Sequence, residues 1–180
     1  MFKNSYKLVL ASSSERRLSL LKRIGYNPDI IDVPEIDENI YINEKPDLYV
    51  KRIAREKAEK ISKKHKNSYI IAADTVIFSG AKIYGKAFNE SDAFTILKKL
   101  SGRRHRVYGA ICLISPNKNI SLKLIITQVS FRVISDKEIK DYISEGEWKG
   151  KAGCYAIQGI ASKFIKKING NYDNVVGLSL

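Results

Sequence analysis

Apolar and polar positions along this 180-residue chain follow two alternating periods. Short, almost wholly apolar runs are typical of strands covered on both faces, and apolar residues at every third or fourth position are typical of amphipathic helices. Together with long hairpins in the second half, this alternation predicts one domain over residues 1–180 with a mixed α/β fold, in which helices flank a strongly bent sheet. The expected helices are 14–24, 46–65, 91–100 and 136–144, and the expected strands are 7–11, 30–33, 69–73, 75–78, 82–84, 106–114 and 120–133.

Several local signals mark the helix ends. Gly25 follows the first helix at a C-cap position, and Pro46 stands at the start of the second. The segment Ser135-Asp136-Lys137-Glu138 matches a capping box, which predicts a helix start at Asp136.

The composition, 44% hydrophobic and 28% charged, is that of a soluble globular protein. No apolar stretch approaches the length of a membrane span or of a signal-peptide core. Cys112 and Cys154 lie among apolar or small residues, which predicts buried thiols in a reducing compartment. We therefore expect a cytoplasmic protein.

The net charge of +13 leaves two interpretations open. Many lysines occupy positions expected on solvated helix faces, so biased composition explains much of the excess. The alternative is a nucleic-acid-binding protein, with candidate patches at 103–106 and at Lys163, Lys166 and Lys167. No aromatic-plus-glycine RNA motif or recognisable helix-turn-helix supports that alternative.

The segment Ser12-Ser13-Ser14-Glu15-Arg16-Arg17 follows the first apolar strand and opens the first helix. Backbone N–H groups at a helix start have no intrahelical partner, and the helix dipole favours negative charge there. Arg16 and Arg17 oppose that dipole, so an anion is expected to compensate them. The sequence therefore predicts an anion site, with phosphate as the candidate ligand.

Two acidic residues are candidates for chemistry. Asp74 is expected immediately beyond the apolar strand 69–73, where ligands of open α/β sheets gather, but it could equally begin a turn. Glu38 lies in the acidic loop 34–38 and could join Asp74 around a divalent cation, although such loops are usually only solvated.

Three further polar residues have two readings each. Lys57 shares the helical stripe of Ile53 and Ile61, so its head either extends to solvent or points into a cleft. Lys86 follows Gly85 and could reach a phosphate, or it could be a solvated turn residue. Gln158 is a single amide in an apolar stretch, suited either to a nucleobase edge or to a loop carbonyl.

Several enzyme classes are excluded by missing motifs. The chain has no P-loop, no Gly-x-Gly-x-x-Gly fingerprint and no His-Glu-x-x-His pair. Neither His65 nor His105 lies near a plausible nucleophile in the sequence, which argues against a Ser/His/Asp hydrolase.

Taken together, these segments resemble the Maf family of nucleoside triphosphate pyrophosphatases over essentially the whole chain. Each piece is weak alone, but their order and spacing make the resemblance specific. The matching pieces are Ser12-x-Ser14-x-Arg16-Arg17, Asp37-Glu38, Arg55-Glu56-Lys57-Ala58, Ala73-Asp74-Thr75-Val76, Gly85-Lys86, Leu100-Ser101-Gly102 with His105, 146–159 and 168–178.

The resemblance implies metal-dependent cleavage of a nucleoside triphosphate to the monophosphate and diphosphate, with Mg²⁺ or Mn²⁺ as the metal. Asp74 would be the general base or a metal-linked acid, and Glu38 would help to hold the metal. Arg16, Thr75 and Gln158 match the group that acts on dTTP and UTP. The triphosphate would be bound by Ser12, Ser14, Arg17, Lys57 and Lys86.

The resemblance also implies a homodimer and a further C-terminal helix that this sequence does not include. Glu15, Ala87, Gly109 and Ser179 depart from residues common in the family, and none of them is a predicted site residue. A relative that binds nucleotides without activity, or a nucleic-acid-binding protein on the same scaffold, remains the alternative.

Overall fold

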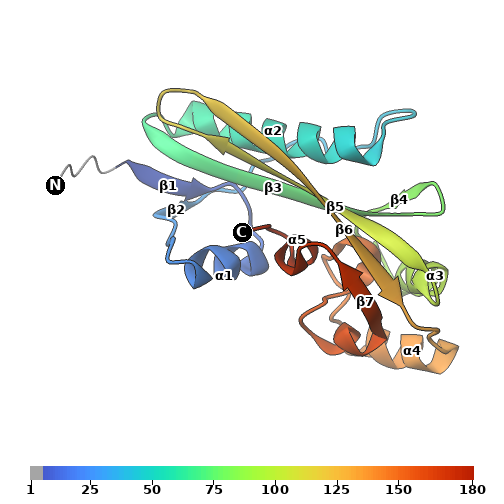
Figure 1. The fold of residues 1–180 in the computed structure, drawn as a ribbon. Helices are drawn as coiled ribbons and strands as arrows, with labels where there is room; N and C mark the ends of the chain where they lie inside the picture. The colour runs from blue at the N-terminus through green and yellow to red at the C-terminus, as the bar shows by residue number, and fades with distance from the viewer. Residues whose placement is uncertain (1–5) are drawn as a thin grey trace. The chain divides into compact units, whose positions relative to one another are not determined.

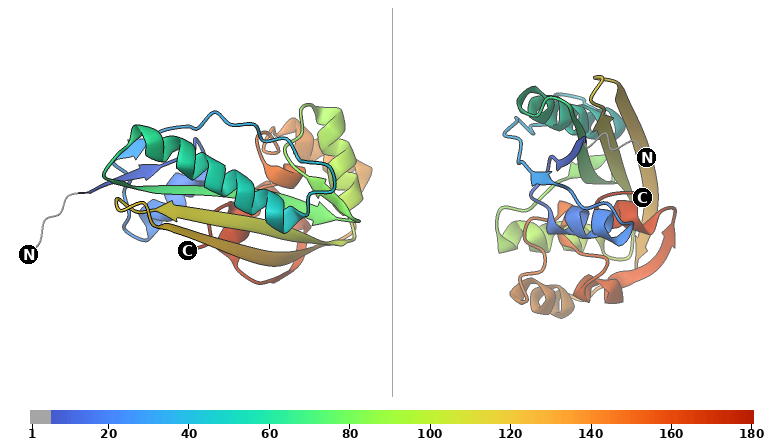
Figure 2. Two further views of the ribbon diagram at one scale, coloured as in Figure 1. Left: turned by 90° about the horizontal axis from the view of Figure 1, so that it is seen from above. Right: turned by 90° about the vertical axis from the view of Figure 1, so that its left-hand side faces the viewer.

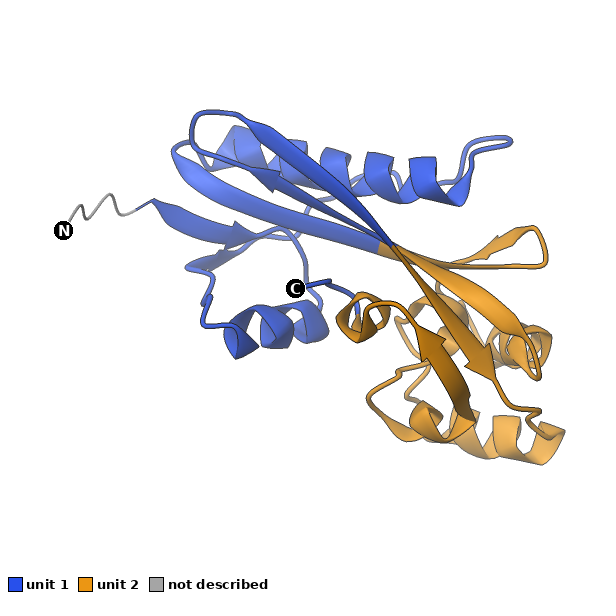
Figure 3. Ribbon diagram, in the orientation of Figure 1, with its two compact units in different colours: residues 1–74, 109–125, 177–180 blue, residues 75–108, 126–176 orange. Residues whose placement is uncertain are grey.

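The computed structural model describes residues 6–180, which fall into two compact units (Figure 3). The first unit comprises residues up to 74, 109–125 and 177–180, and the second comprises 75–108 and 126–176. Three strands pass along the chain from one unit into the other: β3 (Ser68–Ser79), β5 (Arg104–Ile114) and β6 (Ile120–Phe131). The strand order is β2-β1-β3-β5-β6-β7, with β4 paired to β3.

The first unit is built around a parallel set of strands. β1 (Lys7–Leu10) pairs with β2 (Ile30–Ile31) and with the start of β3, so that Val9 lies opposite both Ile30 and Ile70. Helices α1 (Glu15–Arg23) and α2 (Pro46–Lys64) lie on opposite faces of these strands (Figures 1 and 2). The buried core between them is apolar and includes Val9, Leu10, Val50, Ile53, Ala54, Ile61 and Ile70.

The second unit packs helices and short segments against the other halves of the long strands. Its buried cluster includes Leu97, Phe131, Tyr142, Trp148 and Phe164. Its remaining elements are β4 (Lys82–Tyr84), α3 (Glu90–Leu100), α4 (Asp136–Ser144), the 3-10 helices Ala152–Cys154 and Ile160–Phe164, β7 (Ile165–Asn169) and α5 (Tyr172–Val176).

The prediction of a mixed α/β fold with helices flanking a sheet is confirmed, and most expected elements lie within a few residues of their predicted bounds. One prediction is wrong: 69–73 and 75–78 are not two strands. They form the single strand β3, because Asp74 continues the extended backbone and the chain turns only at Gly80 and Ala81, both at positive φ. Gly25, at φ +83°, follows α1 as expected.

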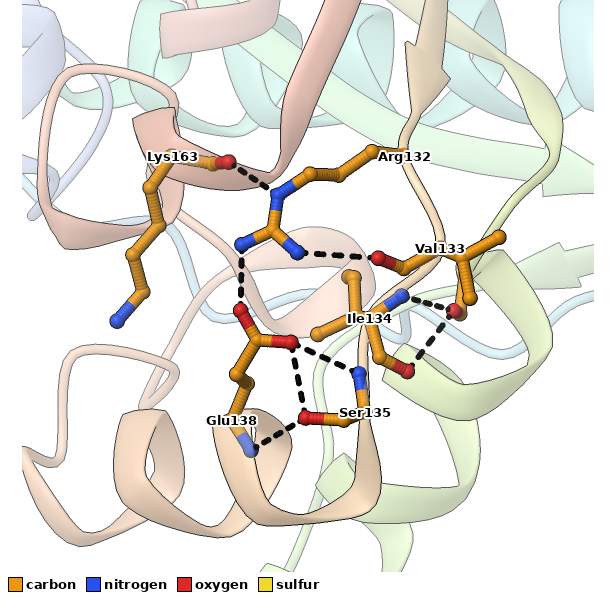
Figure 4. A network of polar contacts seen from close by, with 7 residues as sticks. Arg132, Val133, Ile134, Ser135, Glu138 and Lys163 are labelled. Atoms are coloured by element: carbon orange, nitrogen blue, oxygen red, sulfur yellow. Dashed lines mark hydrogen bonds and ion pairs between the residues drawn. The ribbon is translucent and has the colours of Figure 1, made fainter.

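The capping box at α4 is confirmed in full. The Ser135 hydroxyl accepts the Glu138 N–H, and the Glu138 carboxylate accepts the Ser135 N–H. Arg132 donates to the same carboxylate and to the carbonyls of Val133 and Lys163 (Figure 4). This contact lowers the pKa of Glu138 to about 2, chiefly through the Arg132 hydrogen bond.

Both cysteines are buried free thiols, as the sequence predicts. Over residues 6–180, no helix is both long and apolar enough to cross a bilayer. In the basic run 103–106, Arg103, Arg104 and Arg106 are exposed, whereas His105 is buried.

Candidate functional site

The turn between β1 and α1 is held together by its own hydroxyls. Ser14 is the N-cap of α1 and accepts the Arg17 N–H at 3.5 Å, while the buried Ser12 hydroxyl accepts the Ser14 N–H at 3.2 Å. The Arg17 guanidinium donates to the Ser12 hydroxyl at 3.1 Å and to the Gly177 carbonyl at 2.9 Å. Arg17 is therefore fixed in place at the helix start, and Arg16 beside it is half-buried.

Lys57 points into the first unit and does not extend to solvent. It lies on the apolar stripe of α2 and is 7% exposed. Its Nζ donates to Asp74 Oδ1 at 2.8 Å and contacts Glu38 Oε1 at 2.8 Å. One ammonium therefore contacts both carboxylates, and Asp74 Oδ1 and Glu38 Oε1 can be separated by at most twice the 2.8 Å contact.

Asp74 lies inside β3, and its predicted place beyond the end of a strand is wrong. Asp74 does lie beyond the carboxyl end of a strand, but that strand is the neighbouring β1. The last β1–β3 pair joins Leu10 to Ile71, and Ala11 donates its N–H to the Ile71 carbonyl at 2.8 Å. Asp74 is three residues past that pair, so it lies on the part of β3 that extends beyond the carboxyl end of β1, where Ser12 begins the turn.

Electrostatics connects the turn to the carboxylates. The pKa of Arg17 is lowered, chiefly by burial; the charges of Asp74 and Glu38 oppose this effect, and Arg16 adds to it. Burial also raises the pKa of the Tyr49 phenol, and the negative charges of Asp74 and Glu38 raise it further. Direct contacts and charge interactions thus link five predicted site residues of the first unit in one chain: Ser12, Arg17, Glu38, Lys57 and Asp74.

Thr75, Lys86 and Gln158 belong to the second unit. Successive residues of a strand point to opposite faces, so Thr75 does not share the face of Asp74. Its Oγ1 is buried without a hydrogen-bond partner in the described part of the chain. Lys86 is exposed just after β4, and Gln158 is also exposed, not enclosed by the apolar residues beside it in the sequence.

The donor set of the first unit suits a hard divalent cation. Residues 6–180 contain no group of three or more His, Cys, Asp or Glu side chains that could hold a metal by themselves. Mg²⁺, however, is usually bound by one or two carboxylates together with substrate phosphates and water. Glu38 and Asp74, which share one ammonium, are a pair of this kind.

Sequence reasoning missed the residues that hold the Glu38 loop. The Tyr49 hydroxyl donates to the Glu38 carbonyl at 2.9 Å, and Arg52 binds Glu44 and the Asn39 carbonyl. Tyr49 and Arg52 are three residues apart on α2, a spacing that places them on one face of the helix, but nothing in the pattern indicates that this face meets the loop.

Comparison with known proteins identifies the family. The model of the Maf family, described as "Maf-like protein", matches residues 7–180. The chain belongs to the Maf family. The resemblance seen in the sequence is therefore confirmed.

Maf relatives match along almost the whole chain. A nucleoside triphosphate pyrophosphatase of Ehrlichia ruminantium is 47% identical over 96% of this chain and 90% of its own length. A dTTP/UTP pyrophosphatase of Paramagnetospirillum magneticum is 45% identical over 96% and 91%, and one of Nitrobacter winogradskyi is 47% identical over 97% and 87%. Likeness to solved structures is weaker: a nucleoside-triphosphatase of Mycobacterium abscessus has a TM-score of 0.44 at 18% identity, covering 71% of this chain and 75% of its own.

Proposed function

We propose that this Maf protein hydrolyses dTTP or UTP to the nucleoside monophosphate and diphosphate. Two of the relatives above bear the name dTTP/UTP pyrophosphatase at 45% and 47% identity. The structural observation that carries the proposal is the placement of Lys57 between Glu38 and Asp74, two carboxylates whose charges also act on Arg17.

Hydrolysis of a phosphoanhydride asks mainly for positioning and for neutralisation of charge. The hydroxyls of Ser12 and Ser14 and the guanidinium of Arg17 stand at the start of α1, where backbone N–H groups also favour an anion. In the proposal these groups bind the triphosphate together with Lys57, and Lys86 adds a further positive charge. Lys57 is already desolvated and directed, so binding phosphate requires little further ordering of its side chain.

Glu38 and Asp74 are proposed to hold a divalent cation, Mg²⁺ or Mn²⁺. Glu38 and Asp74 supply two negative charges as ligands for the cation, against the positive charge of Lys57 between them, and the positive charge of Arg17 is left for the phosphates to offset. A bound cation would supply neutralisation of the charge that develops on the phosphate oxygens. Asp74 is the residue proposed to accept the proton of the attacking water, because its carboxylate is buried and directed by Lys57.

Preference for a pyrimidine base is proposed for Arg16, Thr75 and Gln158, the residues that match the dTTP/UTP group. A screen with dTTP, UTP, ATP and GTP tests this part directly. Faster turnover of the purine nucleotides would remove the role given to these three residues.

The substitution Asp74→Asn tests the chemistry. Loss of a general base typically costs about 10²–10⁴-fold in rate, so diphosphate release should fall by at least about 100-fold. Asp141→Asn is the matched control, since Asp141 is an exposed aspartate of α4. Circular dichroism would check that both variants stay folded. Normal turnover by folded Asp74→Asn would refute the role of Asp74.

The proposal extends to a cytoplasmic homodimer. Two buried free thiols are compatible with a reducing compartment, which supports the cytoplasmic location. The dimer rests on the family resemblance, and light scattering of the purified protein tests it.

A further inference from the structure

Glu38 is carried by a long loop that has little structure of its own. Residues 32–45 connect β2 to α2 without regular secondary structure, and most of the side chains from 35 to 43 are exposed. Such a loop gains little from burial, so the position of Glu38 depends on a few specific contacts.

Arg52 provides three of these contacts from the first half of α2. Its Nε and Nη2 bind the two Glu44 carboxylate oxygens at 2.7 and 2.8 Å, and Nη2 also donates to the Asn39 carbonyl at 2.9 Å. The guanidinium stacks over the Tyr41 ring, 3.9 Å from its centroid. One side chain thus holds the residue next to Glu38 and the end of the same loop.

The ion pair between Arg52 and Glu44 is shielded from water. The two side chains are only 18% and 9% exposed, and the pair is bidentate, the strongest arrangement of a guanidinium and a carboxylate. The hydrogen bond from Arg52 holds the pKa of Glu44 below its usual range. The contact therefore persists at neutral pH and is worth more than an exposed surface pair.

Tyr49 fixes the loop at Glu38 itself. Its ring is 6% exposed, and its hydroxyl donates to the Glu38 carbonyl at 2.9 Å. With the backbone held at 38 and 39, the Glu38 carboxylate meets Lys57 at 2.8 Å.

We propose that Arg52 is a positioning residue of this site: through Glu44, Tyr41 and the Asn39 carbonyl it holds the loop so that Glu38 faces Lys57 and Asp74. The inference rests on the proposed function, in which Glu38 and Asp74 hold the cation. Without these Arg52 contacts, the loop samples many conformations, and Glu38 is no longer held in position as a ligand for the cation. Substitution of such outer residues typically lowers metal affinity or activity by about 10–100-fold.

The test compares Arg52→Gln with Arg132→Gln. Arg132 is a matched control, because it also binds a glutamate and backbone carbonyls, but around the α4 cap (Figure 4). Two readouts need no catalysis: hydrogen exchange of loop peptides covering 35–45, and the dissociation constant of Mn²⁺ measured by electron paramagnetic resonance without nucleotide. A third is the Mg²⁺ concentration that gives half-maximal diphosphate release.

Arg52→Gln should exchange faster in the loop, bind Mn²⁺ about 10-fold more weakly or worse, and require correspondingly more Mg²⁺. Arg132→Gln should change neither loop exchange nor metal dependence. An unchanged loop, or a faster-exchanging loop with unaltered Mn²⁺ binding, would overturn the inference. If Arg52→Gln does not fold, Arg52→Lys keeps the charge and loses the planar fork, with the same expected direction.

Failure of the proposed function gives a different result. Asp74→Asn leaves the Arg52 contacts unchanged, so hydrogen exchange of the loop peptides 35–45 should equal that of the unsubstituted protein. If Asp74→Asn binds Mn²⁺ normally and keeps its turnover, the function given to Asp74 is wrong, whatever Arg52→Gln does.

Discussion

The buried histidine of the second unit makes stability depend on pH in a way that can be worked from the structure. His105 is 1% exposed, its Nε2 lies 2.9 Å from the Tyr155 hydroxyl, and its Nδ1 has no hydrogen-bond partner among residues 6–180. Phe131 and Tyr155 meet the ring edge-on. Burial in this apolar setting lowers the pKa of His105 from 6.5 to about 4.

The sign follows from proton binding. Between pH 4 and 6.5 the unfolded chain binds a proton at His105 and the folded protein does not, so the free energy of unfolding falls as the pH falls. A pKa difference of one unit corresponds to about 1.4 kcal/mol, so the complete effect is about 3 kcal/mol, and about 2 kcal/mol of it develops between pH 7 and 5.

The assay is urea unfolding of the unsubstituted protein and of His105→Gln at pH 7, 6 and 5. Glutamine keeps a polar group for the Tyr155 hydroxyl and does not titrate. Both proteins retain His65 and every carboxylate, so other titrations cancel in the difference. From pH 7 to pH 5, the free energy of unfolding of the unsubstituted protein should fall by about 2 kcal/mol relative to that of His105→Gln. Parallel stability curves for the two proteins would refute the burial argument.

Two further substitutions test the site and the fold. Lys57→Met leaves Asp74 as a buried charge without its partner, so urea unfolding should show a free energy of unfolding lower by about 3 kcal/mol. The double substitution Lys57→Met with Asp74→Leu should recover most of this loss. Unchanged stability of Lys57→Met would contradict the argument. Ser135→Ala removes half of the α4 capping box and should lower the free energy of unfolding by about 1 kcal/mol in thermal or urea melts, against no change for Ser144→Ala on the exposed end of the same helix.

Local signals in the sequence were enough to predict α1 to α4, but not α5 or the two 3-10 helices. The starts of α2 and α4 follow from Pro46 and from the capping box at Ser135, because these residues act on the backbone within one turn. The strand-to-helix turn at Ser12 and Ser14 is equally local. The prediction of an anion site at that turn therefore rests on local signals alone.

Strand continuity and residue pairing required the tertiary structure. Asp74 looks like the end of a strand because an acid follows an apolar run, yet β3 continues through it. Its carboxylate is bound by Lys57 of α2, 17 residues away in the sequence. The same packing resolves the two readings of Lys57, whose head is held by two carboxylates that local periodicity cannot place.

The sequence by itself determined the family and the starts of α2 and α4, and it supplied the candidate site residues, because these depend on caps and ordered motifs. Only the tertiary structure decided which of those residues meet, and it added Tyr49 and Arg52 as the supports of the Glu38 loop. The physical reason is that a charged side chain such as Lys57 is held by partners distant in the sequence. The positions of these partners depend on the packing of α2 against β3, which no local pattern encodes.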